Sequence, residues 1–341
     1  MTDRKPTAGA EIEVDNNYQR PDYSATDTED TASQYSTASL TSSVYAYRYE
    51  NGRRYHAFRD GVYNLPNDET EQDRLDIYHH IICMFHARHN KSTDSNLLLF
   101  CPVTENPQKI LDLGTGTGIW AIDAGEKWPS AEVIGTDLSP IQPRWVPPNV
   151  MFQVDDAESE WTWGEEVFDI IHIRHLSGSI RDWDGLIQQC YRALKPGGWL
   201  DLCEFPMEFY SDDKTLEGSE MDRWYKLVQK GTEKTDQRFT PSALPTIMAT
   251  TGFTDLRIKL EKQPIGTWPK DPFQKKLGAY SQMLSESGFE ALGIAIFTRV
   301  LGMSEEECRK IIDDCVEEVR SGKVHSYIVQ HFMCGRKPEE D

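Results

Sequence analysis

Apolar and polar positions in the middle of the chain follow a repeating order of strand, helix and strand. Short apolar runs such as KILDL and FDIIHI are bounded by turn residues, and amphipathic stretches lie between them. This alternation is typical of an α/β domain in which crossover helices connect a mostly parallel sheet. It predicts strands at 109–113, 132–136, 150–154, 168–173 and 198–204, and helices at 118–127, 183–194 and 219–232.

The chain beyond residue 254 predicts two further strands that are separated by helices. The strand patterns are DLRIKLEKQ at 255–263 and VHSYIVQHFMCGRK at 324–337. The residues between them are mainly helical in pattern, and Ser304 begins a helix with a capping box. A strand pair interrupted in this way can carry a cap over a pocket. We therefore expect a core at 107–263, a helical cap insert at 264–323, and a last strand with a C-terminal tail at 324–341.

The N-terminal part divides by composition into a tail and a lid segment. Residues 1–43 hold eight acidic and three basic residues and few large aliphatic side chains, which predicts a disordered acidic tail. Residues 44–106 are rich in aromatic rings and contain a helix that starts after Asn67 or Asp68 and ends near residue 90. Two roles are open for Tyr47, Tyr55, Tyr63 and Arg74 of this lid segment: they either pack on the domain or close over a ligand.

Charge and cysteine content narrow the class of protein. The formal net charge of −20 argues against direct binding to nucleic acid or to an anionic membrane, because both need a basic surface. No run approaches about 18 apolar residues, and the N-terminus lacks the apolar core of a secretory signal. The seven cysteines form no C-x-x-C pair, which is typical of reduced structural thiols. These features predict a cytosolic or nuclear protein without a metal site.

A glycine-rich loop is the strongest chemical signal in the sequence. A predicted strand leads directly into Gly114, Gly116 and Gly118, and a predicted helix follows. Such a loop lets a ligand approach the backbone and the helix N-terminus closely. Asp137 ends the next strand, 19 residues beyond Gly118, where an acidic side chain can bind both hydroxyls of a ribose. The combination predicts a ligand that contains a nucleoside.

The spacing around the loop disfavours a dinucleotide. Ile119 follows Gly118, so the third glycine of the dinucleotide pattern is missing in register. Asp112, on the first strand, would repel a pyrophosphate but suits a ligand with positive charge. S-adenosylmethionine carries a sulfonium and an ammonium group. An NAD-dependent reductase remains a weaker alternative.

These motifs resemble the class I methyltransferases, whose first motif is an acidic residue followed by G-x-G-x-G. The turn LKPGGWL at 194–200 also matches that family. The flanking motifs TDLSPIQPRWVPPNV and HIRHLSGSIRDW are similar to those of the LaeA-like fungal methyltransferases. The resemblance covers about residues 45–337 and implies a Rossmann-like, seven-stranded, mostly parallel sheet. It also implies S-adenosyl-L-methionine as the cofactor.

The candidate site residues follow the carboxyl ends of the predicted strands. Asp155 or Asp156 is expected near the adenine, whereas Trp161 and Trp163 are expected to serve packing. His175 and Glu204 are candidate catalytic residues, because a base could remove a proton from an acceptor; a role in shaping the pocket or binding the cofactor is equally open for both. The candidate cofactor-binding residues are Asp112, Gly114, Gly116, Gly118, Asp137, Leu138, Asp155, Asp156, Ala157 and Arg174.

Two functions remain open within the resemblance. The first is an enzyme that methylates a small molecule of secondary metabolism by in-line displacement. The second is a regulator of secondary metabolite gene expression that acts in a complex with protein partners. The acidic tail favours a partner-binding regulator, while the helical insert with its Cys and Met residues favours an apolar small-molecule acceptor.

Overall fold

The computed structural model of the chain describes residues 9–16, 47–56, 65–89, 98–102, 106–235 and 241–339. Within them an eight-stranded sheet has the order β5-β4-β3-β6-β7-β10-β8, and β9 also pairs with β10. The strands of this sheet are β3 (Lys109–Leu113), β4 (Glu132–Asp137), β5 (Val150–Val154), β6 (Phe168–Arg174), β7 (Leu194–Glu204), β8 (Tyr210–Ser211), β9 (Thr254–Pro264) and β10 (Ser326–Arg336). A separate hairpin consists of β1 (Arg48–Glu50) and β2 (Arg53–Tyr55).

The sheet is mostly parallel, as the sequence predicts. Strands β5, β4, β3, β6 and β7 are parallel to one another. Strand β10 is antiparallel to both β7 and β9, so the last strand in the chain lies between two earlier ones. Seven long strands therefore form the predicted sheet. The two-residue β8 pairs with the start of β10, and β7 pairs with the later residues of β10.

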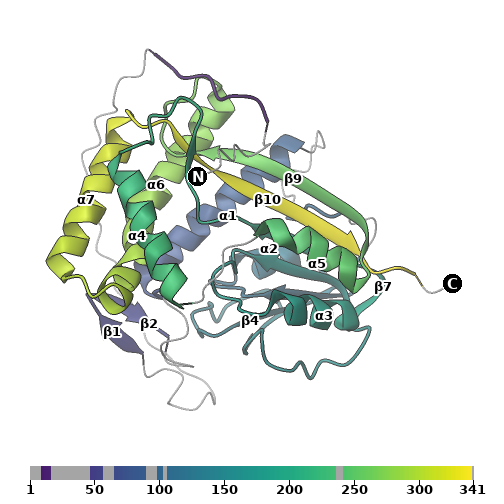
Figure 1. Cartoon of the computed structure of the whole chain (residues 1–341). Helices are drawn as coiled ribbons and strands as arrows, with labels where there is room; N and C mark the ends of the chain where they lie inside the picture. Colours follow the sequence, from purple (N-terminus) through teal and green to yellow (C-terminus); the bar gives the residue numbers. More distant parts are fainter. Residues whose placement is uncertain are drawn as a thin grey trace.

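Helices cover both faces of the sheet and build a cap at one end (Figure 1). Helices α3 and α5 pack on one face, and α1, α2 and α6 pack on the other. Helices α4, α6 and α7 pack together as the cap, and Figure 1 shows β9 and β10 running from this group into the core. The bounds are α1 Glu69–His89, α2 Ile119–Lys127, α3 Trp183–Ala193, α4 Glu220–Thr235, α5 Leu244–Thr251, α6 Pro272–Ala295 and α7 Glu305–Ser321, with a π-helical turn at Ile296–Val300.

The predicted elements are present, with small differences at their ends. Asp68 begins α1, because its side chain accepts a hydrogen bond from the backbone N–H of Glu71. The capping box at Ser304 is also present. Strand β7 starts four residues earlier than predicted, since the backbone of Gly197 and Gly198 pairs with Lys337 beyond β10. Helix α5 was not predicted.

Part of the expected N-terminal tail is folded. Ile12 is buried beside Trp268, and Val14 forms a β-bridge with Pro269. The backbone N–H of Asp15 donates to the carbonyl of Trp268. The prediction of disorder for residues 1–43 is therefore wrong for 9–16, because Ile12 and Val14 dock there and Glu13 and Asp15 pair with Lys270 and Lys275. The remainder of that tail lies outside the described residues.

The seven cysteines are all free thiols, and six of them are buried. Among the helices of the described ranges, none combines the length and the apolar character that a membrane crossing requires.

One buried carboxylate joins three segments in the middle of the core. Asp201 of β7 is 1% exposed and accepts hydrogen bonds from the backbone N–H groups of Phe100 and Cys101. Its second oxygen lies 3.1 Å from Nδ1 of His172 on β6. The His172 ring stacks on Trp120 of α2, with ring centroids 4.0 Å apart. Asp201 thus fixes residues 98–102, β6 and α2 together.

Replacement of Asp201 by alanine is expected to destabilise the fold by about 3 kcal/mol, because it leaves buried N–H donors without an acceptor. Urea unfolding followed by circular dichroism measures the change. Asp313→Ala on the exposed side of α7 is the control and should stay within about 0.5 kcal/mol of the unchanged protein. Equal stability of both variants would show that Asp201 does not join these segments.

Candidate functional site

The three loop glycines adopt backbone conformations that favour glycine. Gly114, Gly116 and Gly118 have φ values of 71°, 58° and 82°. A Cβ atom at Gly118 would lie 2.4 Å from Cζ of Phe152, and one at Gly114 would lie 2.5 Å from Cδ2 of Leu176. The loop therefore has no room for larger residues at these two positions, and it turns directly into α2, as predicted.

Two acidic side chains flank this loop. Asp112 is 3% exposed and accepts a 2.5 Å hydrogen bond from Oγ1 of Thr115. Asp137, at the end of β4, is partly exposed and accepts hydrogen bonds from the backbone N–H groups of Gly116 and Ser139, both at 2.9 Å. Burial raises the pKa of the Asp137 carboxyl to about 6, and the charge of Asp112 acts in the same direction. The structure thus brings the predicted carboxylates and glycines into one site.

Helix α1 lies against this loop from the other side. Oγ1 of Thr117 donates to a carboxylate oxygen of Asp76 at 2.7 Å, and Nδ2 of Asn67 donates to Oγ of Ser139 at 3.3 Å. Leu75 lies 3.4 Å from the position that a Cβ of Gly116 would take. The predicted lid segment therefore contacts the glycine loop through α1.

Three of the four predicted lid residues are described, and one of them, Arg74, also lines the cavity at His175. Tyr55 is buried under the guanidinium of Arg299, and Arg74 forms a bidentate pair with Glu71. Tyr47 lies beneath Arg54. Tyr63 lies outside the described residues.

The residues beyond β5 form a turn at the same edge of the sheet. Asp155 is exposed and donates its backbone N–H to the carbonyl of Asp137. The carboxylate of Asp156 accepts from the backbone N–H of Glu158. Leu138 and Ala157 are half-buried nearby in the chain. Both aspartates remain candidates for an adenine contact. Trp161 and Trp163 pack into the core, as expected.

His172 and Arg174 point to the face of the sheet that carries α1 and α2. Nη1 of Arg174 donates to Nδ1 of His79 at 3.1 Å, so the other ring nitrogen of His79 carries the hydrogen and donates to Asp123. Arg174 thereby links β6 to α1 and α2, and its predicted contact with a cofactor stays a prediction.

His175 lies at a small cavity next to the glycine loop. The cavity is about 80 Å³, and Leu75, which contacts the loop, is also part of its wall. His175 has a φ of 56°, in the left-handed region that a non-glycine residue rarely adopts. Burial lowers the pKa of His175 well below its usual value, and the charge of Arg174 adds to this. The apolar part of the wall consists of Leu65, Leu75, Phe205, Met207, Val228, Leu292 and Ile296.

Glu204 lies behind this cavity rather than in its wall. The side chain is fully buried, and its two oxygens accept hydrogen bonds from the backbone N–H groups of Leu176 and Ser177. Burial raises the pKa of Glu204 to about 7. Its contacts suit a residue that positions the loop after His175, and they include no residue of the cavity's apolar wall.

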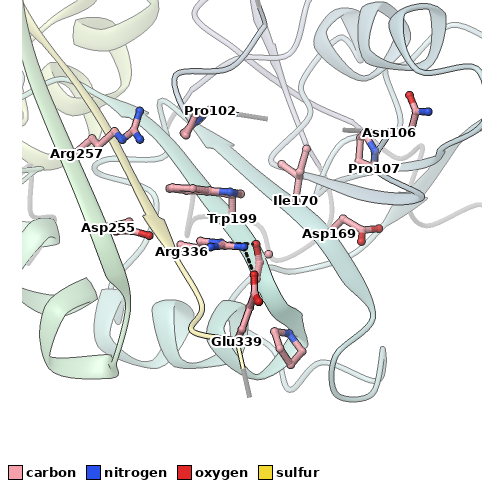
Figure 2. Close-up of a pocket in the computed structure, with 13 residues that line it drawn as sticks. Pro102, Asn106, Pro107, Asp169, Ile170, Trp199, Asp255, Arg257, Arg336 and Glu339 are labelled. Atoms are coloured by element: carbon pink, nitrogen blue, oxygen red, sulfur yellow. Dashed lines mark hydrogen bonds and ion pairs between the residues drawn. The ribbon is translucent and has the colours of Figure 1, made fainter. Parts of the chain in front are cut away.

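A larger hollow lies at the opposite end of the parallel strands. Figure 2 shows Trp199, Arg257 and Arg336 around this hollow of about 520 Å³. Its residues precede β3, lie near the start of β6, β7 and β9, and end the antiparallel strand β10, so the hollow is at the amino ends of the parallel strands. Arg336 pairs with Glu339 and with the carbonyl of Gly197. Ligands of open α/β sheets bind at the carboxyl ends of the strands, which places the candidate site at the glycine loop.

Sequence reasoning missed three polar residues of the site. Asp76 and Gln142 contact the glycine loop, since Nε2 of Gln142 donates to the carbonyl of Gly116 at 2.7 Å. Gln330 of β10 lies 3.3 Å from Nε2 of His175. The sequence does show Gln330 as an amide within the mostly apolar run YIVQHFMC. Its contact with His175 could be found only from the fold.

Comparisons with known proteins agree with this geometry. A family model described as "Methyltransferase domain" matches residues 84–258. The chain is 40% identical to methyltransferase pytC of Aspergillus terreus, over 89% of this chain and 92% of the relative. It is 36% identical to the secondary metabolism regulator laeA of Aspergillus fumigatus, over 89% of this chain and 80% of the relative. A phosphoethanolamine N-methyltransferase 2 of Haemonchus contortus, solved with S-adenosyl-L-methionine, is 19% identical with a TM-score of 0.45, and the match covers 80% of this chain and 59% of that one.

Gly118→Ala is expected to destabilise the protein more than Gly218→Ala does. Both glycines have φ near 80°, but only Gly118 has an aromatic ring where the new Cβ would lie. The strained φ costs about 1 to 2 kcal/mol in each variant, and overpacking against Phe152 adds about 1 to 3 kcal/mol at Gly118. Urea unfolding of both variants measures the difference. Equal losses would contradict the tight contact between the loop and β5.

Proposed function

The chain belongs to the methyltransferase-domain family and to its LaeA-like group, and from this membership we propose that it methylates a small apolar molecule that carries a hydroxyl group. S-adenosyl-L-methionine is the methyl donor. The observation that supports a small-molecule acceptor is the apolar cavity beside the glycine loop, with His175 in its wall.

The donor site fits the chemistry of S-adenosyl-L-methionine. The loop offers carboxylates from Asp112 and Asp137, and no Lys or Arg occurs in residues 112–118 or 137–139. Such a set attracts a cation and repels a pyrophosphate. Asp137 would accept hydrogen bonds from the ribose hydroxyls, and Asp112 would face the positively charged methionine end. Leu138, Ala157 and one of the two aspartates at 155 and 156 would surround the adenine.

The protein contributes mainly alignment to the reaction. When bound, the cofactor supplies an electrophilic methyl group that an acceptor can attack in line. The cavity walls orient the acceptor and exclude water, and correct alignment can lower a barrier by about 7 to 11 kcal/mol. Leu75 contacts the loop at Gly116 and also lines the cavity, so it connects the donor and acceptor sides of the site. No metal is part of this proposal.

A second candidate function is regulation of secondary metabolism within a protein complex. The identity of 36% to laeA of Aspergillus fumigatus and of 39% to regulator LAE1 of Cochliobolus heterostrophus supports it. For either function we propose a cytosolic or nuclear protein without direct contact to nucleic acid or membranes, in agreement with its free thiols and acidic charge. Proteins that co-purify with the chain from nuclei, without methyl transfer to any extracted metabolite, would favour the regulator.

The affinity for S-adenosyl-L-methionine is expected to fall as the pH decreases from 7 to 5. The ribose hydroxyls donate to the charged form of Asp137, so a carboxyl with a pKa of about 6 must lose its proton before binding. Below pH 6 the dissociation constant should rise by up to about tenfold per pH unit. Isothermal titration calorimetry at pH 5, 6 and 7 measures this.

Asp137→Asn is the non-ionising control for this titration; its Nδ2 cannot accept from a backbone N–H, so the variant also loses the contact with Gly116 or with Ser139. It should bind more weakly at pH 7 and show no pH dependence between 5 and 7. A wild-type affinity that is constant over this range would refute the assigned ribose contact. Absence of any binding to the wild-type protein would refute the proposed function.

Leu292→Trp should block the acceptor cavity without affecting donor binding. Leu292 lines the cavity from α6, and an indole would occupy most of its volume. We expect methyl transfer from labelled donor to an apolar metabolite extract to fall at least about tenfold, while the donor's dissociation constant stays within about twofold. Met283→Trp, on the exposed side of α6, should leave both quantities unchanged. Full activity of Leu292→Trp would place the acceptor elsewhere.

A further inference from the structure

A chain of buried hydrogen bonds leads from helix α6 to the ring of His175, and its direction can be worked out. It starts at the main-chain carbonyl of Leu277, which can only accept. Oγ of Ser281 donates its single hydrogen to this carbonyl at 3.0 Å. The same oxygen lies 3.0 Å from the side-chain amide of Gln263, so the Gln263 atom facing it must be the donor Nε2.

The orientation of Gln263 determines that of Gln330. With Nε2 of Gln263 on Ser281, its Oε1 faces Gln330 at 2.9 Å, and this contact requires Nε2 of Gln330. The second hydrogen of that amide goes to Oη of Tyr78 at 2.6 Å. Oε1 of Gln330 is left facing Nε2 of His175 at 3.3 Å and Sγ of Cys203 at 3.8 Å.

His175 must therefore donate through Nε2. A carbonyl oxygen has no hydrogen to give, so the contact with Gln330 is a hydrogen bond only if Nε2 of His175 carries the proton. Nδ1 is then the basic atom of the ring. Gln330 and Gln263 are 0% and 1% exposed, so water does not compete for these contacts and the amides cannot turn over without losing them.

We propose that Gln330 is a positioning residue for methyl transfer: it holds His175 in the Nε2–H form, so that Nδ1 accepts the proton of a hydroxyl-bearing acceptor in the cavity. This inference rests on the proposed function. The left-handed backbone of His175 supports it, because the strain is maintained by the N–H of His175 donating to the carbonyl of Cys203 and by the ring contact with Gln330.

The step balances in atoms and charge. The acceptor oxygen forms a bond to the methyl carbon, the carbon–sulfur bond breaks, and its electron pair stays on sulfur as a neutral thioether. The hydroxyl proton passes to Nδ1, and the imidazolium later releases it to water. One positive charge leaves the sulfonium as one appears on the ring. The step therefore adds no net charge to the site. This matters because burial and the charges of Arg174 and Arg74 lower the pKa of His175 and disfavour its charged form.

Tyr78 and Phe205 hold the His175 ring between them. The Tyr78 and His175 ring centroids are 4.1 Å apart at an interplanar angle of 62°, and Phe205 meets the ring edge at 5.3 Å and 86°. These contacts fix where the ring lies but not which nitrogen is protonated. The choice of tautomer depends on Gln330 alone among the contacts described for the ring.

Nitrogen-15 NMR of the histidine side chains tests the tautomer directly. The His175 signals are assigned by their absence in His175→Asn. We expect the wild-type ring to be neutral with the proton on Nε2 at pH 7. Phenol, as a probe with a hydroxyl group, should shift the Nδ1 resonance, whereas benzene should not. A proton on Nδ1, or a phenol response equal to that of benzene, would overturn the proposal.

Two variants separate the role of Gln330 from simple packing. The double variant Gln263→Met with Gln330→Met replaces both amides by apolar side chains of similar shape, which is often tolerated in a core. It should give a mixture of tautomers and lower kcat for methyl transfer at least about tenfold, with KM unchanged. Ser285→Ala on the same helix removes only a hydrogen bond to the main-chain carbonyl of Ser281, so it should retain the Nε2–H form and the activity. An Nε2–H ring in the double variant would overturn the proposal.

Failure of the inference and failure of the proposed function give different results. If the protein binds the donor and transfers methyl groups while His175 carries its proton on Nδ1, only the inference is lost. If the tautomer is Nε2–H but calorimetry detects no donor binding, the proposed function fails, and the role of Gln330 in transfer fails with it.

Discussion

The position of β10 between β7 and β9 is the constraint on which the rest of the molecule depends. Strand β10 is the last strand in the chain but lies inside the sheet. Among the described strands β9 pairs only with β10, so β9 gains its partner only when β10, beyond the cap insert, has folded. The same pairing brings His331 opposite Glu204 and carries the adjacent Gln330 beneath the site. Pairing over many intervening residues is slow, because the ordering cost precedes the gain from contacts. The core, the cap and the acceptor side of the site are therefore completed together.

The two sides of the site have different physical origins. The donor side is local: β3, the glycine loop, α2 and the end of β4 form one continuous stretch, and Asp137 bonds directly to the loop backbone. The acceptor side is assembled from α1, the loop after β6, the cap and β10. The register of neighbouring parallel strands is enough to bring the residues of the donor side together. The residues of the acceptor side come together only when elements that are distant in the sequence pack against one another.

This difference explains how far the sequence could be interpreted. The strands, most helices and the glycine loop could be predicted because periodicity and turn residues are local signals. Asp112 and Asp137 could be named as candidates because they lie at or next to the carboxyl ends of predicted strands. Gln330 and Asp76 could not, since each contacts an element far away in the chain, whereas for Glu204 the sequence left catalysis and a role in shaping the pocket equally open. The order of residues 9–16 was missed because the prediction used the average composition of residues 1–43, in which the two aliphatic residues Ile12 and Val14 carry little weight.

The docked segment at residues 9–16 also adds to the surface of the cap. Residues 9–16 are attached to the start of the cap, and the hairpin at 47–56 is attached through Arg53 to Asp68 and Glu290. Two N-terminal segments that are distant from the cap in the sequence are therefore both fixed to it. Deletion of residues 9–16 would uncover Trp268, which Ile12 contacts in the structure, so these N-terminal residues contribute to the surface of the cap.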